Sequence, residues 1–361
     1  MGTEASSWDF DRDFDAVLSA AGDGTIDREG ALLLFKATAG DDERSQARRA
    51  RLFETARHVR ERELGNVFHH TGGFGAVLPC SLDPLCRYCP YWSTSESKRM
   101  SIPQLVAGIG LLVNLGVRSF HLSGGSQPGS DGEEILEVVR AIAAAGYGDL
   151  DIYVNCGASM NDAALREMRD LGVKRVGAVF EITNPEAFAQ VKPGDDLQAK
   201  FAFAEQIGQA GLELGSGLMA GLGPQETRYE DYVDGLFTLR RFPHLTSVYF
   251  SKFTPEPTTP MRDHPACSLD EAMCLLAVGR LVLPCVDLSP AAGWRDAERF
   301  RAIEAGAGTG WFSLPLHLAK NYFEGHQGEA TDHLGEVEVR DNRLAVQEAL
   351  APYGVTFSNP A

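Results

Sequence analysis

The chain has 361 residues, of which 44% are hydrophobic, and it carries a formal net charge of −17 at pH 7. This length allows one large α/β domain or two average ones, and the acidic balance argues against non-specific binding to nucleic acid or to an anionic membrane. The sequence contains neither a run of about 18 apolar residues nor an apolar signal-peptide core at its start. The seven cysteines, an odd number, fit a reducing compartment. We therefore expect a soluble, cytoplasmic protein without a nucleic-acid or membrane partner.

The first part of the chain is predicted to be helical, over residues 10–21, 28–39 and 43–62. The high charge density of the last segment predicts an outer, solvated layer. Short runs rich in β-branched and aromatic residues follow, and each run ends in Gly, Ser, Thr or Pro, as strands do. These predicted strands cover residues 66–70 continuing towards 77, 119–123, 151–156, 175–182, 213–219, 247–253, 281–288 and 309–314.

Helical patterns lie between these strands, over residues 134–145, 161–171, 198–210 and 270–282. Eight strands that alternate with helices predict a parallel sheet closed as an α/β (β/α)8 TIM barrel with an N-terminal helical extension. An open, doubly wound sheet is the alternative. We expect the extension to cover residues 1–65 and the barrel residues 66–324, with residues 325–361 as a tail packed on the barrel.

Three cysteines follow the first predicted strand: Cys80, Cys86 and Cys89, in a C-x5-C-x2-C spacing. Three thiolates this close can hold three irons of a 4Fe–4S cluster. No fourth cysteine follows nearby, so the fourth iron is open to another ligand. Because the active sites of barrels lie at the carboxyl ends of the strands, we expect such a cluster at the mouth of the barrel.

Other interpretations of these cysteines exist. Structural zinc is the main one, because Cys86 and Cys89 form a common zinc half-site, and its fourth ligand would come from His69, His70 or Cys156. A redox-active dithiol is another, although this C-x-x-C does not open a helix as in thioredoxin-like proteins. Core cysteines fit poorly, since the segment is rich in proline and polar residues.

The chain resembles the radical S-adenosylmethionine superfamily, in particular the branch of biotin synthase, the iron–iron hydrogenase maturase and methylornithine synthase. The usual spacing there is C-x3-C-x2-C; the longer spacing of this chain is similar to a branch that helps to build the guanylylpyridinol cofactor. Residues 180–186, Phe-Glu-Ile-Thr-Asn-Pro-Glu, resemble the Glu-Thr-x-Asn-Pro-Glu run of the maturase and methylornithine synthase branch. The resemblance covers about residues 66–323 and implies an enzyme with one 4Fe–4S cluster and S-adenosylmethionine.

The resemblance also implies roles for single residues. Cys80, Cys86 and Cys89 would be the cluster ligands at the catalytic centre. Glu181 would contact S-adenosylmethionine, and Lys200, with Lys192 as second choice, would pair with its carboxylate. In the Gly-Gly turn that binds the methionine amino group, a serine replaces the acidic residue of the family. The implied cofactor contacts are Tyr88, Gly124, Gly125, Ser126, Gln127, Asn155, Glu181, Lys200, Met219 and Leu222.

The implied reaction is reductive cleavage of S-adenosylmethionine to a 5′-deoxyadenosyl radical, which abstracts hydrogen from a small metabolite and leads to carbon-skeleton rearrangement or C–C bond remodelling. A flavodoxin- or ferredoxin-type protein would donate the electron. Of the positions that hold the second cluster of biotin synthase, only Cys156 is a cysteine here; His121 and Gly215 occupy the others. We therefore expect no second cluster.

Asp287 and Ser289 are two apart near a predicted strand end, so both side chains can face the barrel interior. A shielded carboxylate needs a cationic partner, and we expect these residues, with Ser251, to contact an amino-acid-like substrate. An internal partner for Asp287, Arg295 or Arg301, is the alternative. The alternative functions are a cofactor-assembly reaction, suggested by the cysteine spacing, and a zinc-stabilised or nonenzymatic barrel.

Overall fold

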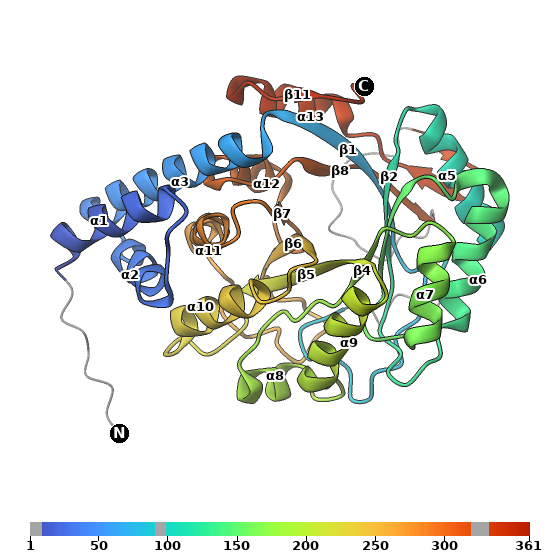
Figure 1. Cartoon of the computed structure of the whole chain (residues 1–361), viewed down its shortest axis with the longest axis horizontal. Helices are drawn as coiled ribbons and strands as arrows, with labels where there is room; N and C mark the ends of the chain where they lie inside the picture. Colours follow the sequence, from blue (N-terminus) through green and yellow to red (C-terminus); the bar gives the residue numbers. More distant parts are fainter. Residues whose placement is uncertain (1–8, 91–98, 319–331) are drawn as a thin grey trace.

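Eight parallel strands form a ring at the centre of the molecule (Figure 1). The computed structural model describes residues 9–90, 99–318 and 332–361. The strands are paired in the order β7-β6-β5-β4-β3-β2-β1-β8. Their bounds are Val67–Phe74 (β1), Ser119–Ser123 (β2), Asp151–Asn155 (β3), Arg175–Gly177 (β4), Glu213–Ala220 (β5), Leu245–Lys252 (β6), Asp287–Pro290 (β7) and Gly310–Leu318 (β8).

The seam of the ring lies between β7 and β8. The backbone N–H of Gly308 donates to the carbonyl of Leu288 at 2.5 Å, and the Ser289 hydroxyl donates to the carbonyl of Gly310 at 3.4 Å. These contacts bring the last strand back beside the seventh. The predicted α/β barrel is therefore confirmed, and its carboxyl strand ends all open on one side.

Helices cover the outside of the ring (Figure 1). They begin where the sequence supplies caps: Asn161 accepts from the backbone of Ala164 at the start of α7, and Asn184 does the same for α8. The helices are Ile102–Asn114 (α5), Glu133–Ile142 (α6), Asp162–Asp170 (α7), Pro185–Val191 (α8), Leu197–Gln209 (α9), Arg228–Leu239 (α10), Leu269–Val282 (α11) and Asp296–Arg301 (α12), with a π-helix at Ala143–Tyr147 and a 3-10 helix at Ala302–Ala305.

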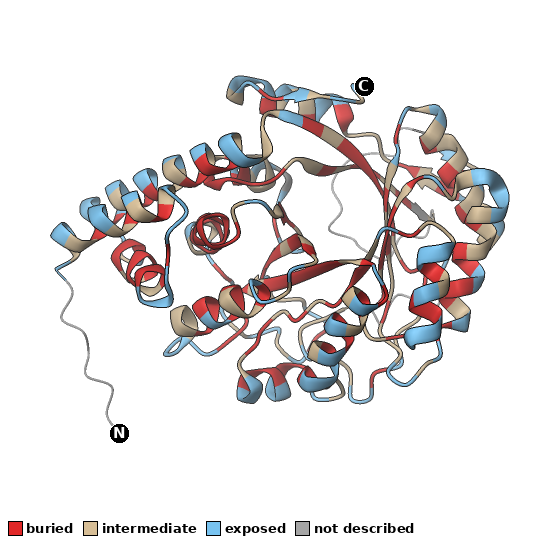
Figure 2. Ribbon diagram, viewed as in Figure 1, coloured by how far each residue is buried: buried red, intermediate tan, exposed pale blue. Residues whose placement is uncertain are grey.

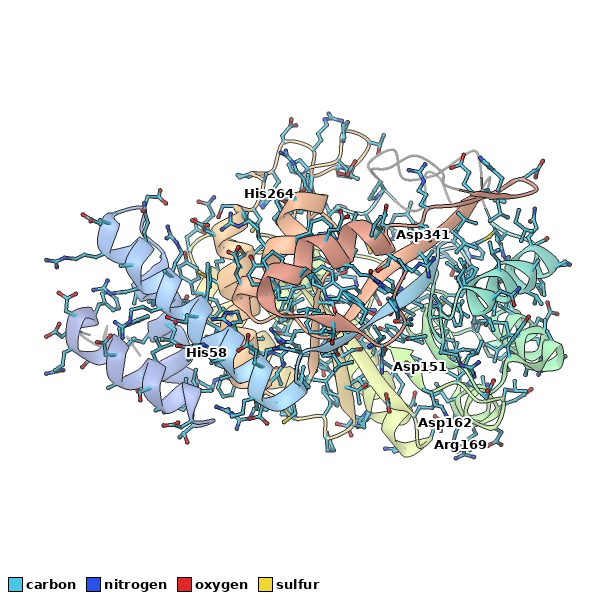
Figure 3. The ribbon with its side chains drawn as sticks, turned by 90° about the horizontal axis from the view of Figure 1, so that it is seen from above. His58, Asp151, Asp162, Arg169, His264 and Asp341 are labelled. Atoms are coloured by element: carbon cyan, nitrogen blue, oxygen red, sulfur yellow. The ribbon has the colours of Figure 1, made fainter. Side chains whose placement is uncertain are left out.

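The N-terminal helices form a layer over α11 and α10. They are α1 (Phe10–Gly22), α2 (Arg28–Thr38) and α3 (Glu43–Leu64). The sequence predicted that α3 is solvated, and this holds for only one face of the helix. His58, labelled in Figure 3, is exposed, whereas Leu52, Ala56 and Val59 are buried. Helix α11 is consequently covered on all sides, and Figure 2 shows it buried almost throughout.

The C-terminal segment extends the sheet as well as packing on it. Strands β9 (Asp332–Leu334) and β10 (Val337–Val339) form an antiparallel hairpin beside β8. Helix α13 (Arg343–Leu350) and a 3-10 turn at Ala351–Tyr353 follow, and β11 (Thr356–Phe357) pairs with the amino end of β1. Among the described residues, no helix has both the length and the apolar character to cross a bilayer.

Two predicted strands differ from the observed ones. The fourth was expected over residues 175–182, but ladder pairing stops at Gly177 and resumes only as a single bridge between Glu181 and Leu218. The seventh was expected over 281–288 and instead covers Asp287–Pro290. Leu281 and Val282 end the buried helix α11, because an apolar run fits a buried helix as well as a strand.

Candidate active site

Four rings from different strands meet inside the barrel. His121 of β2 stacks on Tyr153 of β3 with centroids 4.7 Å apart, and Tyr249 of β6 and Phe312 of β8 lie 5.5 and 5.0 Å from the same imidazole. Burial lowers the pKa of His121 to about 3, so the ring is neutral at physiological pH. A Cβ atom at Gly215 would stand 2.4 Å from the Tyr153 hydroxyl. The middle of the barrel is therefore an uncharged aromatic layer.

The cysteine loop begins at the carboxyl end of β1 and is held against the segment after β2. The N–H of Gly125 donates to the carbonyl of Leu78 at 2.8 Å, and the N–H of Ser81 donates to that of Ser126 at 2.9 Å. A Cβ atom on residue 125 would lie 2.4 Å from the Cα atom of Cys80. Glycine at this position is thus required for the backbone that carries the first cysteine.

The other two cysteines are held from the opposite side. The N–H of Arg87 donates to the carbonyl of Val191 at 2.9 Å, and the Arg87 carbonyl accepts from Met261 at 3.2 Å. Cys80, Cys86 and Cys89 are all partly exposed, and none of them forms a disulfide. Burial raises the pKa of the Cys86 thiol, and the nearby Lys192 opposes the rise. The loop thus presents three thiols at the carboxyl ends of the strands.

Two of the side chains considered as a fourth zinc ligand have other surroundings in the structure. His70 lies near the amino end of β1, where its ring nitrogens contact Ser313 and Gln347. Cys156 is fully buried, and burial raises the pKa of its thiol to about 12.

Glu181 combines an unusual backbone with an unpaired carboxylate. Its φ of 65° is left-handed, and β5 holds it there through the Gly217 carbonyl and the Met219 N–H, at 2.9 and 2.8 Å. Its Oε2 atom is buried and has no hydrogen-bond partner among the described residues. Burial raises the pKa of this carboxyl group, and Lys192 and Lys200 oppose the rise. Strained backbone of this kind is concentrated at functional sites.

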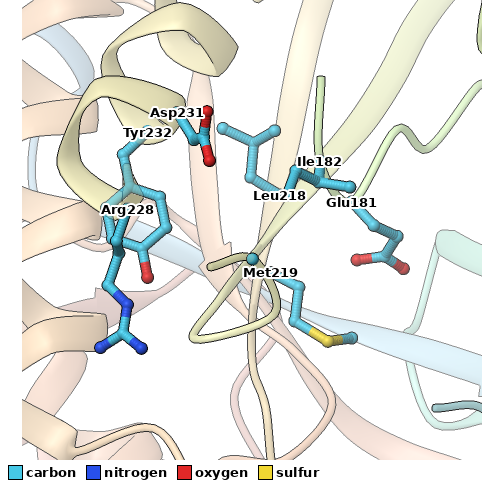
Figure 4. Close-up of a pocket in the computed structure, with 8 residues that line it drawn as sticks. Glu181, Ile182, Leu218, Met219, Arg228, Asp231 and Tyr232 are labelled. Atoms are coloured by element: carbon cyan, nitrogen blue, oxygen red, sulfur yellow. The ribbon is translucent and has the colours of Figure 1, made fainter. Parts of the chain in front are cut away.

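A cavity of about 10 Å³, the size of one water molecule, lies beside this glutamate and is lined by residues such as Ile182, Leu218 and Arg228. In Figure 4 the Glu181 carboxylate points away from Arg228, on the other side of Leu218. The cavity belongs to the packing of α10 against β5. The groups that interact electrostatically with the Glu181 carboxylate are Lys192, Lys200 and Tyr88.

Two lysines converge on one carboxylate oxygen below the cysteine loop. The Nζ atoms of Lys192 and Lys200 each lie 3.1 Å from Oδ2 of Asp195, and the three side chains are 7%, 3% and 5% exposed. Burial, followed by repulsion from Lys192, lowers the pKa of Lys200 to about 8. Burial opposes the charge of Lys192, but Asp195, Cys86 and Glu181 together raise its pKa. The sequence interpretation named both lysines but missed Asp195, whose only local signal is its place in the Lys-Pro-Gly-Asp turn.

The remaining predicted cofactor contacts are spread over the same end of the barrel. Gln127 is committed elsewhere, because its side-chain amide donates to Glu134 at 3.0 Å. Gly124 packs on Leu78 and Cys156, and the carbonyl of Asn155 accepts from its N–H at 3.0 Å. Met219 is partly exposed and Leu222 is buried. The tertiary structure thus brings Tyr88, Glu181 and the lysines together, and gives Gln127 and Leu222 other surroundings.

The predicted position of Asp287 is wrong. Asp287 is the first residue of β7, opposite Ser247 of β6, and therefore lies at the amino end of the strand, away from the cysteine loop. Its Oδ1 atom accepts from the N–H of Thr309 at 2.8 Å. Ser289 is buried beside Tyr249. Ser251, in register with Met219, lies near the carboxyl end of β6, and Ser289 is the last residue but one of β7.

Comparison with known proteins agrees with this geometry. Residues 80–234 match the family model described as the radical SAM superfamily. An uncharacterized protein of Methanocaldococcus jannaschii is 27% identical over 272 residues, 72% of this chain and 68% of that protein. Biotin synthase of Aquifex aeolicus is 26% identical over 58% of this chain and 62% of its own length. The FeFe-hydrogenase maturase subunit HydE of Thermotoga maritima is 23% identical, over 64% and 65%.

Among solved structures, methylornithine synthase superposes with a TM-score of 0.74 over 96% of this chain and 97% of that protein, at 19% identity. This likeness shows the fold. The chain spans a little less than two thirds of the biotin synthase and the maturase subunit named above.

Proposed function

Because this chain belongs to the radical SAM superfamily, whose enzymes use a 4Fe–4S cluster and S-adenosylmethionine, we propose that Cys80, Cys86 and Cys89 hold the cluster and that the protein starts a radical reaction on a small molecule. The observation that carries this proposal is the loop that places three cysteines, none of them in a disulfide, at the carboxyl ends of β1 and β2. Thiolates are the ligands that iron–sulfur clusters require.

The residues around the loop fit such a cluster. Gly125 lets the backbone of Cys80 approach β2 without a clash. The thiolates and the cluster bring negative charge, and the ammonium groups of Lys192 and Lys200 lie within electrostatic reach of Cys86. The unpaired Oε2 atom of Glu181 is a buried acceptor that a ligand would satisfy.

When bound and reduced, the cluster held by Cys80, Cys86 and Cys89 would supply the one electron needed for reductive cleavage of S-adenosylmethionine, and this cleavage would provide methionine and a 5′-deoxyadenosyl radical able to take a hydrogen atom from the substrate. The chain binds and orients the reactants. Glu181 and Lys200 present opposite charges on neighbouring elements, and their electrostatic interaction indicates that the two groups are close. This arrangement suits a zwitterion, whose ammonium faces Glu181 and whose carboxylate faces Lys200.

The substrate would lie above the aromatic layer. His121, Tyr249 and Phe312 keep some exposed surface although they face the barrel interior, and Ser251 lies at the carboxyl end of β6 above Tyr249. The amino-acid character of the substrate depended on Asp287, which lies at the other end of β7. The proposal is therefore a hydrogen abstraction from a small metabolite that leads to carbon-skeleton rearrangement or C–C bond remodelling, with a flavodoxin- or ferredoxin-type electron donor.

A second candidate within the same chemistry is a cofactor-assembly reaction. The C-x5-C-x2-C spacing favours it, because the guanylylpyridinol branch, which the cysteine run resembles, has the same spacing. The two candidates share the cluster, the cleavage of S-adenosylmethionine and the hydrogen abstraction. They differ in the substrate from which the hydrogen atom is taken, so product analysis with candidate substrates separates them.

The experiment is the cleavage of S-adenosylmethionine by the anaerobically reconstituted protein with dithionite as reductant. We expect 5′-deoxyadenosine and methionine in equal amounts, detected by mass spectrometry. The triple Cys80, Cys86 and Cys89→Ala variant should bind little iron and form no 5′-deoxyadenosine. Cys285→Ala, at an exposed cysteine, is the control and should behave as the unmodified protein. Retention of a four-iron cluster in the triple variant would falsify the ligand assignment.

A further inference from the structure

A short turn links the cysteine loop to the two buried lysines. Residues 192–195 read Lys-Pro-Gly-Asp, between α8 and α9. A Cβ atom at Gly194 would stand 2.1 Å from the carbonyl oxygen of Pro84, so the turn lies directly against the cysteine loop. The turn is closed by the N–H of Asp195, which donates to the carbonyl of Lys192 at 3.0 Å. The turn therefore packs against the loop between Cys80 and Cys86.

The Asp195 carboxylate has close contacts at both oxygen atoms, by a hydrogen bond at Oδ1 and by ion pairs without hydrogen-bond geometry at Oδ2. Oδ1 accepts from the backbone N–H of Asp196 at 3.0 Å, and Oδ2 lies 3.1 Å from the Nζ atoms of both Lys192 and Lys200. Lys192 comes from the end of α8 and Lys200 from the first turns of α9. One carboxylate oxygen thus sets the separation of two ammonium groups that come from different helices.

The Asp195 carboxylate balances only one of the two ammonium groups, and Glu181, which interacts electrostatically with both lysines, is the second carboxylate within reach. Two ammonium groups and one carboxylate leave one positive charge, in side chains that are at most 7% exposed. Buried charges are costly unless they are paired. The Oε2 atom of Glu181, however, has no hydrogen-bond partner among the described residues. A ligand carboxylate would pair with the lysines, and a ligand ammonium group would pair with Glu181.

We propose that Asp195 is a positioning residue, which holds the ammonium groups of Lys192 and Lys200 as one fixed pair so that Lys200 meets the carboxylate of bound S-adenosylmethionine. This inference rests on the proposed function and adds to it a residue without direct contact to the ligand. Without Asp195, the two buried ammonium groups repel each other, and Lys200 is the one whose pKa is already lowered, by burial and then by Lys192. Asp195 therefore keeps Lys200 both charged and in place.

The test compares a ligand that has the amino-acid group with one that lacks it. S-adenosylhomocysteine carries the α-ammonium and the α-carboxylate, whereas 5′-methylthioadenosine has neither. Dissociation constants are measured by equilibrium dialysis on the anaerobically reconstituted protein. In Asp195→Asn we expect the affinity for S-adenosylhomocysteine to fall about 10-fold or more, as for a lost charge-assisted contact, while the affinity for 5′-methylthioadenosine stays within about twofold. Lys200→Met should show the same selectivity, and the double variant should lose little more.

The controls separate positioning from general damage. Glu205→Gln removes the same charge from an exposed side chain of α9 and should leave both affinities unchanged. Asp195→Glu keeps the charge but displaces the oxygen, so it tests the proposal even if Asp195→Asn does not fold; we expect a smaller loss that is again confined to S-adenosylhomocysteine. An equal loss of both ligands, or no loss of S-adenosylhomocysteine in either Asp195 variant, overturns the proposal. Failure of the unmodified protein to bind either ligand would instead contradict the proposed function.

Discussion

Gly125 and Cys80 lie in a contact that admits no side chain, since a Cβ atom on residue 125 would be 2.4 Å from the Cα atom of Cys80. We predict that Gly125→Ala displaces the first cysteine and lowers the iron content after reconstitution to less than half. Gly73→Ala is the control, because its new methyl group would be 3.5 Å from the Phe312 ring, an ordinary contact. Iron and sulfide analysis decides the point, and full iron in Gly125→Ala contradicts it.

Glu181 is predicted to lower the stability of the fold that it serves. A residue with a side chain in left-handed backbone costs about 1–2 kcal/mol, and its φ is 65°. Glycine removes this cost and the buried carboxylate, at some entropic expense. We expect Glu181→Gly to raise the free energy of unfolding by about 1 kcal/mol and to weaken the binding of S-adenosylmethionine. Glu181→Gln keeps the strained backbone and should weaken binding without this gain, as urea unfolding and binding titrations will measure.

His70 makes the stability of the protein sensitive to acid. Burial lowers the pKa of His70 to about 4, and the unfolded value is about 6.5. Below pH 6.5 the unfolded chain therefore binds a proton that the folded protein excludes. Stability from this site is complete above pH 6.5 and falls as the pH drops towards 4, by roughly 3 kcal/mol in all.

We predict that His70→Asn makes the pH dependence of the unfolding free energy between pH 6.5 and 4 shallower, while His121, whose pKa burial also lowers, keeps its own contribution. The steepest contribution of one histidine is about 1.4 kcal/mol per pH unit. His58→Asn, at an exposed position on α3, should keep the slope of the unmodified protein. Equal slopes in the two variants would show that His70 is not the group responsible.

Asp287 is predicted to stabilise the seam of the barrel. Its carboxylate accepts from the N–H of Thr309 at 2.8 Å, between β7 and β8. Asp287→Ala leaves that N–H without its acceptor, which costs about 1–3 kcal/mol. Ser289→Ala removes a longer contact of 3.4 Å and should cost less. Urea unfolding measures both; an unchanged midpoint in Asp287→Ala contradicts the structural role.

Sequence patterns located most elements because these depend on local chemistry. The predicted strand over residues 119–123 coincides with β2 at both ends, and the helical pattern over residues 161–171 corresponds to α7, which Asn161 caps. The pattern was wrong at the seventh strand, because apolar residues such as Leu281 and Val282 fit a buried helix as well as a strand. The predicted strand ended just after Asp287, whereas the observed β7 begins there. Asp287 therefore lies at the opposite end of the barrel from the one predicted.

The cysteine loop was evident in the sequence alone, since its three thiols lie within ten residues and their spacing is a property of the chain. The site around it depended on the tertiary structure. Asp195 has no motif of its own and acquires a role only because α8 and α9 bring Lys192 and Lys200 to one oxygen. His121 and Tyr153 likewise meet only when β2 pairs with β3. Ligand spacing along a chain can be read directly, whereas contacts between distant segments exist only after the strands and helices have packed.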